Sequence, residues 1–240
     1  MERWRGKHAL VTGASAGIGF AIAEGLARAG VNVFACARNV STLEGLAGSL
    51  PPNSGKVFPL KADLSKENEI VDLFKTIQTQ CGHVDILVNN VGLSLFGGLD
   101  SQSTTEWRLM LDVNIMTAAI CTKETLKLLD EDKVPSGHII NINSAEWDPT
   151  YEGLNFCRGT KEMMAALTKA LHTELTKKKR KIRVTSICPG LVASSVIDNL
   201  TNCFPDITAL SCQDVANGVL YVLSVPEHVV ITELTMLAQG

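Results

Sequence analysis

Residues 12–19 read Thr12-Gly13-Ala14-Ser15-Ala16-Gly17-Ile18-Gly19 and lie between an apolar run, residues 8–11, and an amphipathic stretch, residues 17–29. Glycines in such a turn let the backbone approach a phosphate closely, and the helix that follows points its free N–H groups and the positive end of its dipole at that charge. A Gly-rich turn between the first strand and first helix of a β-α-β unit predicts a dinucleotide site, with an ordinary strand-to-helix turn as the alternative. The residues that we expect to contact the dinucleotide are Gly13, Ser15, Gly17, Ile18 and Gly19.

The same alternation continues along the chain. Further apolar runs at residues 31–36, 57–60, 85–89, 138–142, 182–187 and 229–237 alternate with amphipathic stretches at 41–48, 66–80, 104–112, 114–129, 155–178 and 213–223. Strands alternating with helices indicate right-handed β-α-β crossovers, and strands that are apolar on both sides are typical of a sheet covered on both faces. We therefore expect one α/β domain over residues 1–240, a Rossmann-type doubly wound parallel sheet of about seven strands. A short substrate lid is expected over residues 191–212.

Composition excludes several classes of protein. The chain has 240 residues, 45% hydrophobic and 20% charged, with a formal net charge of −3. That is too apolar for a disordered chain and lacks the basic excess of a nucleic-acid binder. An apolar run of about eighteen residues, the length of a membrane span, does not occur, and the charged residues 1–7 do not resemble a secretory leader. The seven scattered cysteines predict reduced thiols in a cytoplasmic protein, with neither a disulfide framework nor a metal site.

The spacing Thr-Gly-x-x-x-Gly-x-Gly over residues 12–19 resembles that of the short-chain dehydrogenase/reductase family, and the likeness covers essentially the whole chain. Four further motifs carry it: Asp63-Leu64, Asn89-Asn90-Val91-Gly92, Asn114, and Pro189-Gly190-Leu191-Val192 followed by Ser194. The segments Cys36-Ala37-Arg38-Asn39 and Ile139-Ile140-Asn141-Ile142-Asn143-Ser144 are similar to those of the group formed by animal member 11 and insect farnesol-dehydrogenase-like reductases.

The resemblance implies roles for these motifs. It places Asp63 and Leu64 at the adenine, Asn90 at the cofactor, and Pro189, Gly190, Val192 and Ser194 over the nicotinamide. It makes Asn114 the residue that holds a proton-relay water. It also implies that the helices at residues 114–129 and 155–178 form the interface of a homodimer or homotetramer.

The end of the second strand indicates which nicotinamide cofactor binds. It reads Cys36-Ala37-Arg38-Asn39, and the next acidic residue is Glu44. A carboxylate here would hydrogen-bond the ribose hydroxyls of NAD, whereas an arginine pairs with the 2′-phosphate of NADP. The pattern predicts NADP(H), with Arg38 and Asn39 at the phosphate; a surface arginine without a ligand is the alternative.

The catalytic motif is where the chain departs from the family pattern. The resemblance implies a proton-donating tyrosine four residues before a lysine and thirteen after a serine that binds the substrate oxygen. Ser144 and Lys161 fit this register, but position 157 is cysteine. A thiol beside a cation ionises more readily, yet it is a weaker and shorter hydrogen-bond donor than a tyrosine hydroxyl. The candidate catalytic residues are Ser144, Lys161, Asn114 and Cys157, with Tyr151 or a water held by Asn114 and Lys161 as alternative acids.

Three functions therefore remain open. The favoured one is an NADP(H)-dependent oxidoreductase that reduces or oxidises an apolar carbonyl or alcohol, a terpenoid or steroid for example, by an altered proton route. The others are an NADP(H)-binding enzyme with non-redox chemistry, such as cyclisation or isomerisation, and a catalytically silent binding protein. Apolar residues in segments 93–96, 145–154 and 191–204 fit a small apolar substrate, whereas Tyr221 is expected in the core.

Overall fold

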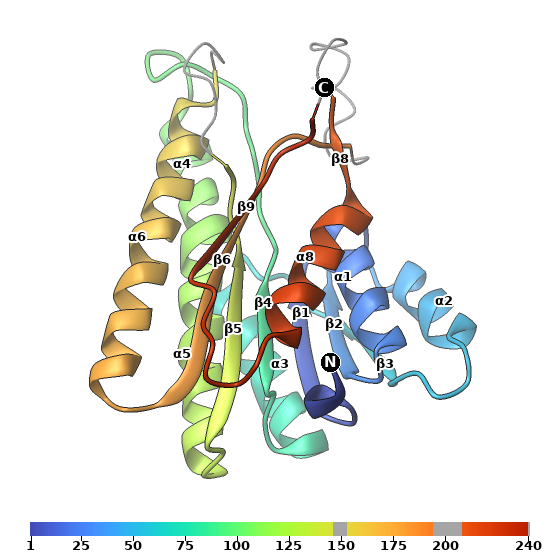
Figure 1. Ribbon diagram of the computed structural model, residues 1–240. Helices are drawn as coiled ribbons and strands as arrows, with labels where there is room; N and C mark the ends of the chain where they lie inside the picture. The colour runs from blue at the N-terminus through green and yellow to red at the C-terminus, as the bar shows by residue number, and fades with distance from the viewer. Residues whose placement is uncertain (146–152, 194–207, 240) are drawn as a thin grey trace.

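A parallel sheet forms the centre of the computed structural model, which describes residues 1–145, 153–193 and 208–239 (Figure 1). Its strand order is β3-β2-β1-β4-β5-β6-β9, and every neighbouring pair is parallel. The strands are β1 His8–Thr12, β2 Asn32–Ala37, β3 Val57–Lys61, β4 Ile86–Asn89, β5 Ser136–Ile142, β6 Lys181–Pro189 and β9 Glu233–Met236. This arrangement confirms the predicted Rossmann-type α/β fold with its seven-stranded sheet.

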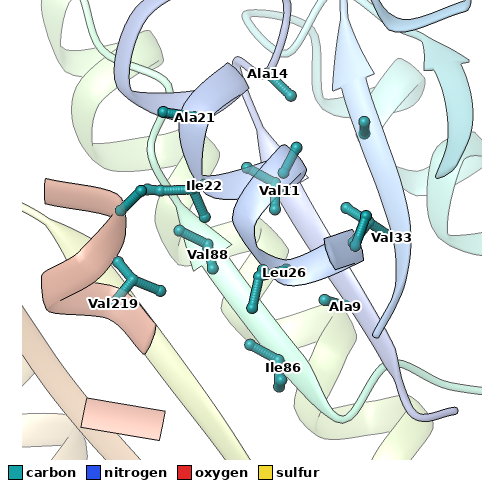
Figure 2. Close-up of a cluster of buried hydrophobic side chains, with 14 of the residues drawn as sticks. Ala9, Val11, Ala14, Ala21, Ile22, Leu26, Val33, Ile86, Val88 and Val219 are labelled. Atoms are coloured by element: carbon teal, nitrogen blue, oxygen red, sulfur yellow. The ribbon is translucent and has the colours of Figure 1, made fainter. Parts of the chain in front are cut away.

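Helices cover both faces of the sheet. One face carries α1 Gly17–Arg28, α2 Ser41–Ser49 and α8 Cys212–Ser224, and the other carries α3 Glu67–Cys81, α5 Thr117–Glu131 and α6 Asn155–Lys177. Successive strand residues point to opposite faces, so Val11 joins the core under α1 while Leu10 joins the core under α3 and α5. Figure 2 shows the first of these cores, where Ile22 and Leu26 of α1 lie over Val11 and Val88.

Several local features differ from the sequence prediction. The predicted helices at 104–112 and 114–129 are joined, because α4 Thr104–Leu111 runs through a π-helical turn, η2 Asp112–Met116, into α5. The last strand is shorter than predicted, since Val229 closes a turn on Pro226 before β9 begins. Tyr221 is 56% exposed, so its predicted place in the core is wrong: α8 turns Val219 and Val222 inward instead.

The remaining short elements are η1 Glu2–Trp4 at the N-terminus and a parallel pair of two-residue strands, β7 Val192–Ala193 and β8 Leu210–Ser211. Most of the predicted lid, residues 191–212, lies outside the described residues. Among the helices that the structure describes, none has the length and hydropathy needed to cross a membrane.

The strand order also positions the site. β1 lies between β2 and β4, so the chain leaves it first toward one edge of the sheet and later toward the other. In open α/β sheets ligands bind outside the carboxyl ends of the strands at such a reversal. The loops after β1, β4, β5 and β6 therefore frame the candidate site.

Candidate functional site

The loop after β1 has the geometry of a phosphate cradle. Gly17 begins α1 with φ +58°, a left-handed conformation that favours glycine. Gly19 lies so close to the loop that a Cβ on it would be 2.3 Å from the carbonyl oxygen of Gly13. The preceding residue, Ala16, makes no side-chain cap. The N–H groups of the first turn of α1, which have no partners within the helix, thus remain available to a pyrophosphate.

The end of β4 holds this loop in place. The Asn90 side-chain amide donates to the carbonyl oxygens of Thr12 (2.8 Å) and Gly13 (3.2 Å). The hydroxyl of Thr12 in turn accepts from the N–H groups of Asn90 (2.9 Å) and Val91 (3.1 Å). Asn90, which is predicted to contact the cofactor, therefore holds the loop after β1 in its conformation.

Arg38 and Asn39 lie at the edge of the cradle, at the exposed end of β2. The N–H of Ala14 donates to the carbonyl of Cys36 at 3.0 Å and ties the loop to this strand. The side-chain oxygen of Asn39 accepts from the N–H and hydroxyl of Ser41 and so caps the start of α2. Within the described part of the chain, the Arg38 guanidinium has no hydrogen-bond or ion-pair partner, so it is free to meet a phosphate.

A groove of about 500 Å³ runs between α1 and α2. Its lining residues include Ser15, Gly17, Thr42 and Gly45. The hydroxyl of Thr42 donates to the carbonyl of Ser15 at 2.8 Å and fixes α2 against the loop. The groove therefore opens directly beside the loop after β1, where the dinucleotide is expected.

Asp63 and Leu64 follow β3. The Asp63 carboxylate accepts from the N–H and hydroxyl of Ser65 and lies 3.4 Å from the ammonium of Lys66. The hydrogen bond from the Ser65 hydroxyl is the main cause of the lowered pKa of Asp63. Leu64 is buried, and its carbonyl accepts from the Thr117 hydroxyl at 2.5 Å. Both residues are thus held at the carboxyl edge of the sheet, where an adenine contact was predicted.

Helix α6 brings Cys157 and Lys161 to the carboxyl end of β5, one helical turn apart. The Lys161 ammonium donates to the carbonyl of Ile142 at 3.3 Å, close to Ser144 in the chain. Burial lowers the pKa of Lys161, whereas the nearby thiols of Cys157 and Cys188 act in the opposite direction. The predicted residues Ser144, Cys157 and Lys161 are therefore brought to one edge of the sheet.

Cys157 is buried, with 7% of its surface exposed. Its Sγ lies 3.0 Å from the hydroxyl oxygen of Ser94, and Ser94 itself is exposed. Ser94 belongs to no sequence motif, so no role was predicted for it. Its position could have suggested one, because it follows the Asn89-Asn90-Val91-Gly92 motif directly and lies in a segment expected to line the pocket.

Asn114 lies in the π-helical turn and fixes that loop. Its side-chain oxygen accepts from the N–H of Leu93 (2.7 Å), and its amide donates to the carbonyl of Leu93 (2.9 Å) and the hydroxyl of Thr160 (3.0 Å). Each polar atom of this side chain thus has a protein partner. The relay water predicted at Asn114 stays a prediction, because the side chain already has these protein partners.

Pro189 and Gly190 end β6, and the N–H of Gly190 donates to the carbonyl of Met236 at 2.8 Å. Val192 is buried in β7. Ser194, Tyr151 and the apolar residues Trp147, Val196, Leu200 and Phe204 lie outside the described residues.

Comparison with known proteins agrees with this arrangement. Residues 7–202 match the family described as short chain dehydrogenase. The chain belongs to the short-chain dehydrogenase family. Dehydrogenase/reductase SDR family member 11 of Gallus gallus is 42% identical over 98% of this chain and 97% of its own length. Farnesol dehydrogenase of Aedes aegypti is 35% identical over 100% of this chain and 99% of its own length.

Solved structures of short-chain dehydrogenases show the same fold. The closed form of a serine dehydrogenase complexed with NADP+ is 30% identical, with a TM-score of 0.85 over 97% of this chain and 96% of that one. A metagenomic short-chain oxidoreductase in complex with NADP is 26% identical, with a TM-score of 0.81 over 98% of this chain and 99% of that one.

Members of the short-chain dehydrogenase family are oxidoreductases that use a nicotinamide cofactor, and the residues of this chain fit such a group. The uncapped start of α1 and the close approach of Gly19 to Gly13 are suited to a pyrophosphate. Position 157, where the family pattern predicts a tyrosine, is cysteine, and its thiol lies 3.0 Å from the Ser94 hydroxyl.

Proposed function

We propose that the protein is an NADP(H)-dependent oxidoreductase that interconverts an apolar carbonyl compound and its alcohol through an altered proton route. The observation that carries the proposal is the convergence of the cradle after β1 and Lys161 of α6 at one edge of the sheet.

Arg38 supports NADP(H) over NAD(H). Its side chain is exposed at the end of β2, next to the loop that forms the cradle. Arginine pairs with phosphate through two parallel hydrogen bonds, which a ribose hydroxyl does not match. Asn39 would lie beside the same phosphate, although its side-chain oxygen already caps α2.

The substrate is proposed to be apolar. Phe96 is 54% exposed in the loop after β4, and Leu95 and Leu154 pack in the cluster around Cys157. A relative is named farnesol dehydrogenase, and farnesol is a terpenoid alcohol. A terpenoid, a steroid or a similar apolar carbonyl compound fits these surroundings.

When bound, the reduced nicotinamide supplies a hydride to the carbonyl carbon. The residues of this chain then have to orient the substrate oxygen and provide a proton. Ser144 is proposed to bind that oxygen, and the buried ammonium of Lys161 favours negative charge on nearby groups. A missing general acid costs typically about 10²–10⁴-fold in rate, so a weaker proton route still allows reduction.

We also propose a homodimer or homotetramer in the cytoplasm. Apolar side chains of α4, η2 and α6 are exposed on one chain: Leu109, Met116, Met163 and Leu167. The described cysteines are all free thiols, which fits a reducing compartment.

The test is NADPH oxidation by the wild type and by Cys157→Tyr, side by side, on apolar aldehydes and ketones. We expect the wild type to turn over, with a modest gain in the tyrosine variant. Turnover by Cys157→Tyr alone would instead leave the natural protein as a non-redox enzyme or a binding protein. Substrate conversion at constant NADPH absorbance would identify the non-redox enzyme.

A further inference from the structure

We propose that Ser94 provides the hydroxyl that protonates the substrate oxygen, and that Cys157 positions this hydroxyl and restores its proton. The proposal rests on the proposed function and names the proton donor of that same site. Its central observation is the 3.0 Å contact between the Ser94 hydroxyl and the Cys157 thiol, which joins the loop after β4 to the first turn of α6.

Exposure decides which of the two groups meets a substrate. Cys157 is buried beneath the loop after β4, whereas Ser94, which belongs to that loop, is exposed. A hydroxyl is also a stronger hydrogen-bond donor than a thiol. The Ser94 hydroxyl therefore lies closer to a bound substrate than the Cys157 thiol does, and it is the better hydrogen-bond donor of the two.

The loop holds Ser94 on both sides. Leu93 is fixed through both main-chain polar groups by Asn114, and the carbonyl of Leu95 accepts from the Gln102 side chain at 2.9 Å. Further along, the N–H of Gly97 donates to the carbonyl of Gly153 at 2.9 Å. A donor must be held in a defined place to transfer a proton efficiently, and these contacts supply that restraint.

The surroundings of the pair are otherwise apolar. The cluster around Cys157 is formed by Leu93, Leu95, Trp107, Met110, Leu154 and Phe156. Lys161, one turn further along the same helix, places a positive charge near the thiol. Low polarity around the pair strengthens the hydrogen bond between its members.

The proton balance closes without a further reactant. The electron pair reaches the carbonyl carbon with the hydride of the proposed function, and the substrate oxygen becomes an alkoxide. The O–H bond of Ser94 breaks as the alkoxide takes its proton, and the S–H bond of Cys157 breaks to restore the serine hydroxyl. The thiolate recovers its proton from the Lys161 ammonium, which exchanges with solvent. The transfer from Cys157 to the Ser94 alkoxide is downhill, because a thiol is far more acidic than an alcohol, and the reprotonation of the thiolate draws on exchange with solvent.

The experiment compares wild type, Ser94→Ala and Ser94→Thr in the reduction of decanal by NADPH. We expect Ser94→Ala to lose about 10²-fold in kcat/KM and Ser94→Thr, which keeps a hydroxyl, to remain within about tenfold of wild type. Ser101→Ala is the matched control, because its hydroxyl bonds only within the same loop, to Gly98. Wild-type kcat/KM in Ser94→Ala would overturn the proposal.

A second readout needs neither cofactor nor turnover. Alkylation of Cys157 by iodoacetamide at one fixed pH, followed peptide by peptide, reports on the surroundings of the thiol. Loss of the Ser94 hydroxyl, which lies 3.0 Å from Sγ, should change the rate of alkylation, and identical rates would count against the pair. A wild type that binds NADPH yet reduces no carbonyl compound overturns the proposed function itself. That result differs from failure of the present inference, in which wild type and Ser94→Ala reduce decanal equally well.

Discussion

The side-chain amide of Asn114 makes two hydrogen bonds to the main chain of Leu93. Its oxygen accepts from the Leu93 N–H at 2.7 Å, and its nitrogen donates to the Leu93 carbonyl oxygen at 2.9 Å. The same nitrogen reaches the Thr160 hydroxyl on α6. One buried side chain thus joins the π-helical turn, the loop after β4 and helix α6. This clamp is a structural role for Asn114 in addition to the predicted role in a proton relay.

Replacing Asn114 by Asp should therefore break the clamp with almost no change in shape. A carboxylate cannot donate the hydrogen bonds that Asn114 gives to the Leu93 carbonyl and the Thr160 hydroxyl. Its second oxygen would instead repel the Leu93 carbonyl oxygen in a buried position. We expect a loss of about 2–3 kcal/mol in the free energy of unfolding, measured by urea denaturation. Asn68→Asp, the same change on the exposed first turn of α3, should be close to neutral. Equal stability of the two variants would show that the clamp contributes nothing.

Gly19→Ala tests the phosphate cradle. A Cβ at this position would lie 2.3 Å from the Gly13 carbonyl oxygen and 2.4 Å from the Asn90 amide nitrogen, so the loop must open. We expect NADPH affinity, measured by fluorescence titration, to fall at least about tenfold as the first-turn N–H groups move. Gly48→Ala in α2, where a Cβ meets nothing within 4 Å, should keep affinity and gain about 0.5–1 kcal/mol in stability. A Gly19→Ala protein with wild-type affinity would place the pyrophosphate elsewhere.

Arg38→Asp should reverse the preference for the phosphorylated cofactor. Losing a charge-assisted pair costs about 2–3 kcal/mol, or roughly 30–150-fold in the dissociation constant of NADPH. NADH, which has no 2′-phosphate, should bind equally well or better, and Arg38→Lys should fall between the two. Parallel titrations with both cofactors measure the ratio. An unchanged ratio would mean that Arg38 is a surface arginine without a ligand.

Features set by residues that are close together in the chain could be predicted from the sequence, whereas contacts between distant segments could not. The cradle at residues 12–19 was predictable because its glycines, strand and helix are neighbours in sequence. The Ser94–Cys157 pair was not, because its members are separated by 63 positions and meet only after β4 and α6 are packed. Tyr221 was misplaced for a related reason: an aromatic side chain in an apolar helix does not reveal which face of α8 meets the sheet.

Stability should fall at alkaline pH because of buried thiols. Burial raises the pKa of Cys36 from 9.0 to about 12, so the folded protein keeps a proton that the unfolded chain releases above pH 9. The stabilisation is complete below pH 9 and is lost as the pH rises from 9 toward 12. Cys36→Ala should start less stable at pH 7 but show a shallower decline in Tm between pH 8.5 and 10.5. Cys212→Ala, which removes a half-buried thiol, should change the slope less. If Tm falls with pH equally steeply in wild type and Cys36→Ala, this thiol is excluded as the cause.

Self-association should depend on the exposed apolar side chains of η2 and α6. Met116 and Leu167 are 47% and 40% exposed in the single chain, and Met163, one helical turn before Leu167, is 45% exposed. Exposed apolar side chains of this size are typical of surfaces that a partner covers, and a two-fold interface would use the same patch on both chains. We expect a dimer or tetramer in sedimentation velocity at micromolar concentration, and a monomer after Leu167→Glu. Leu99→Glu, at a more exposed leucine in the loop before α4, should leave the assembly intact. A monomeric wild type would show that these helices do not associate, and dissociation by Leu99→Glu alone would move the interface to that loop.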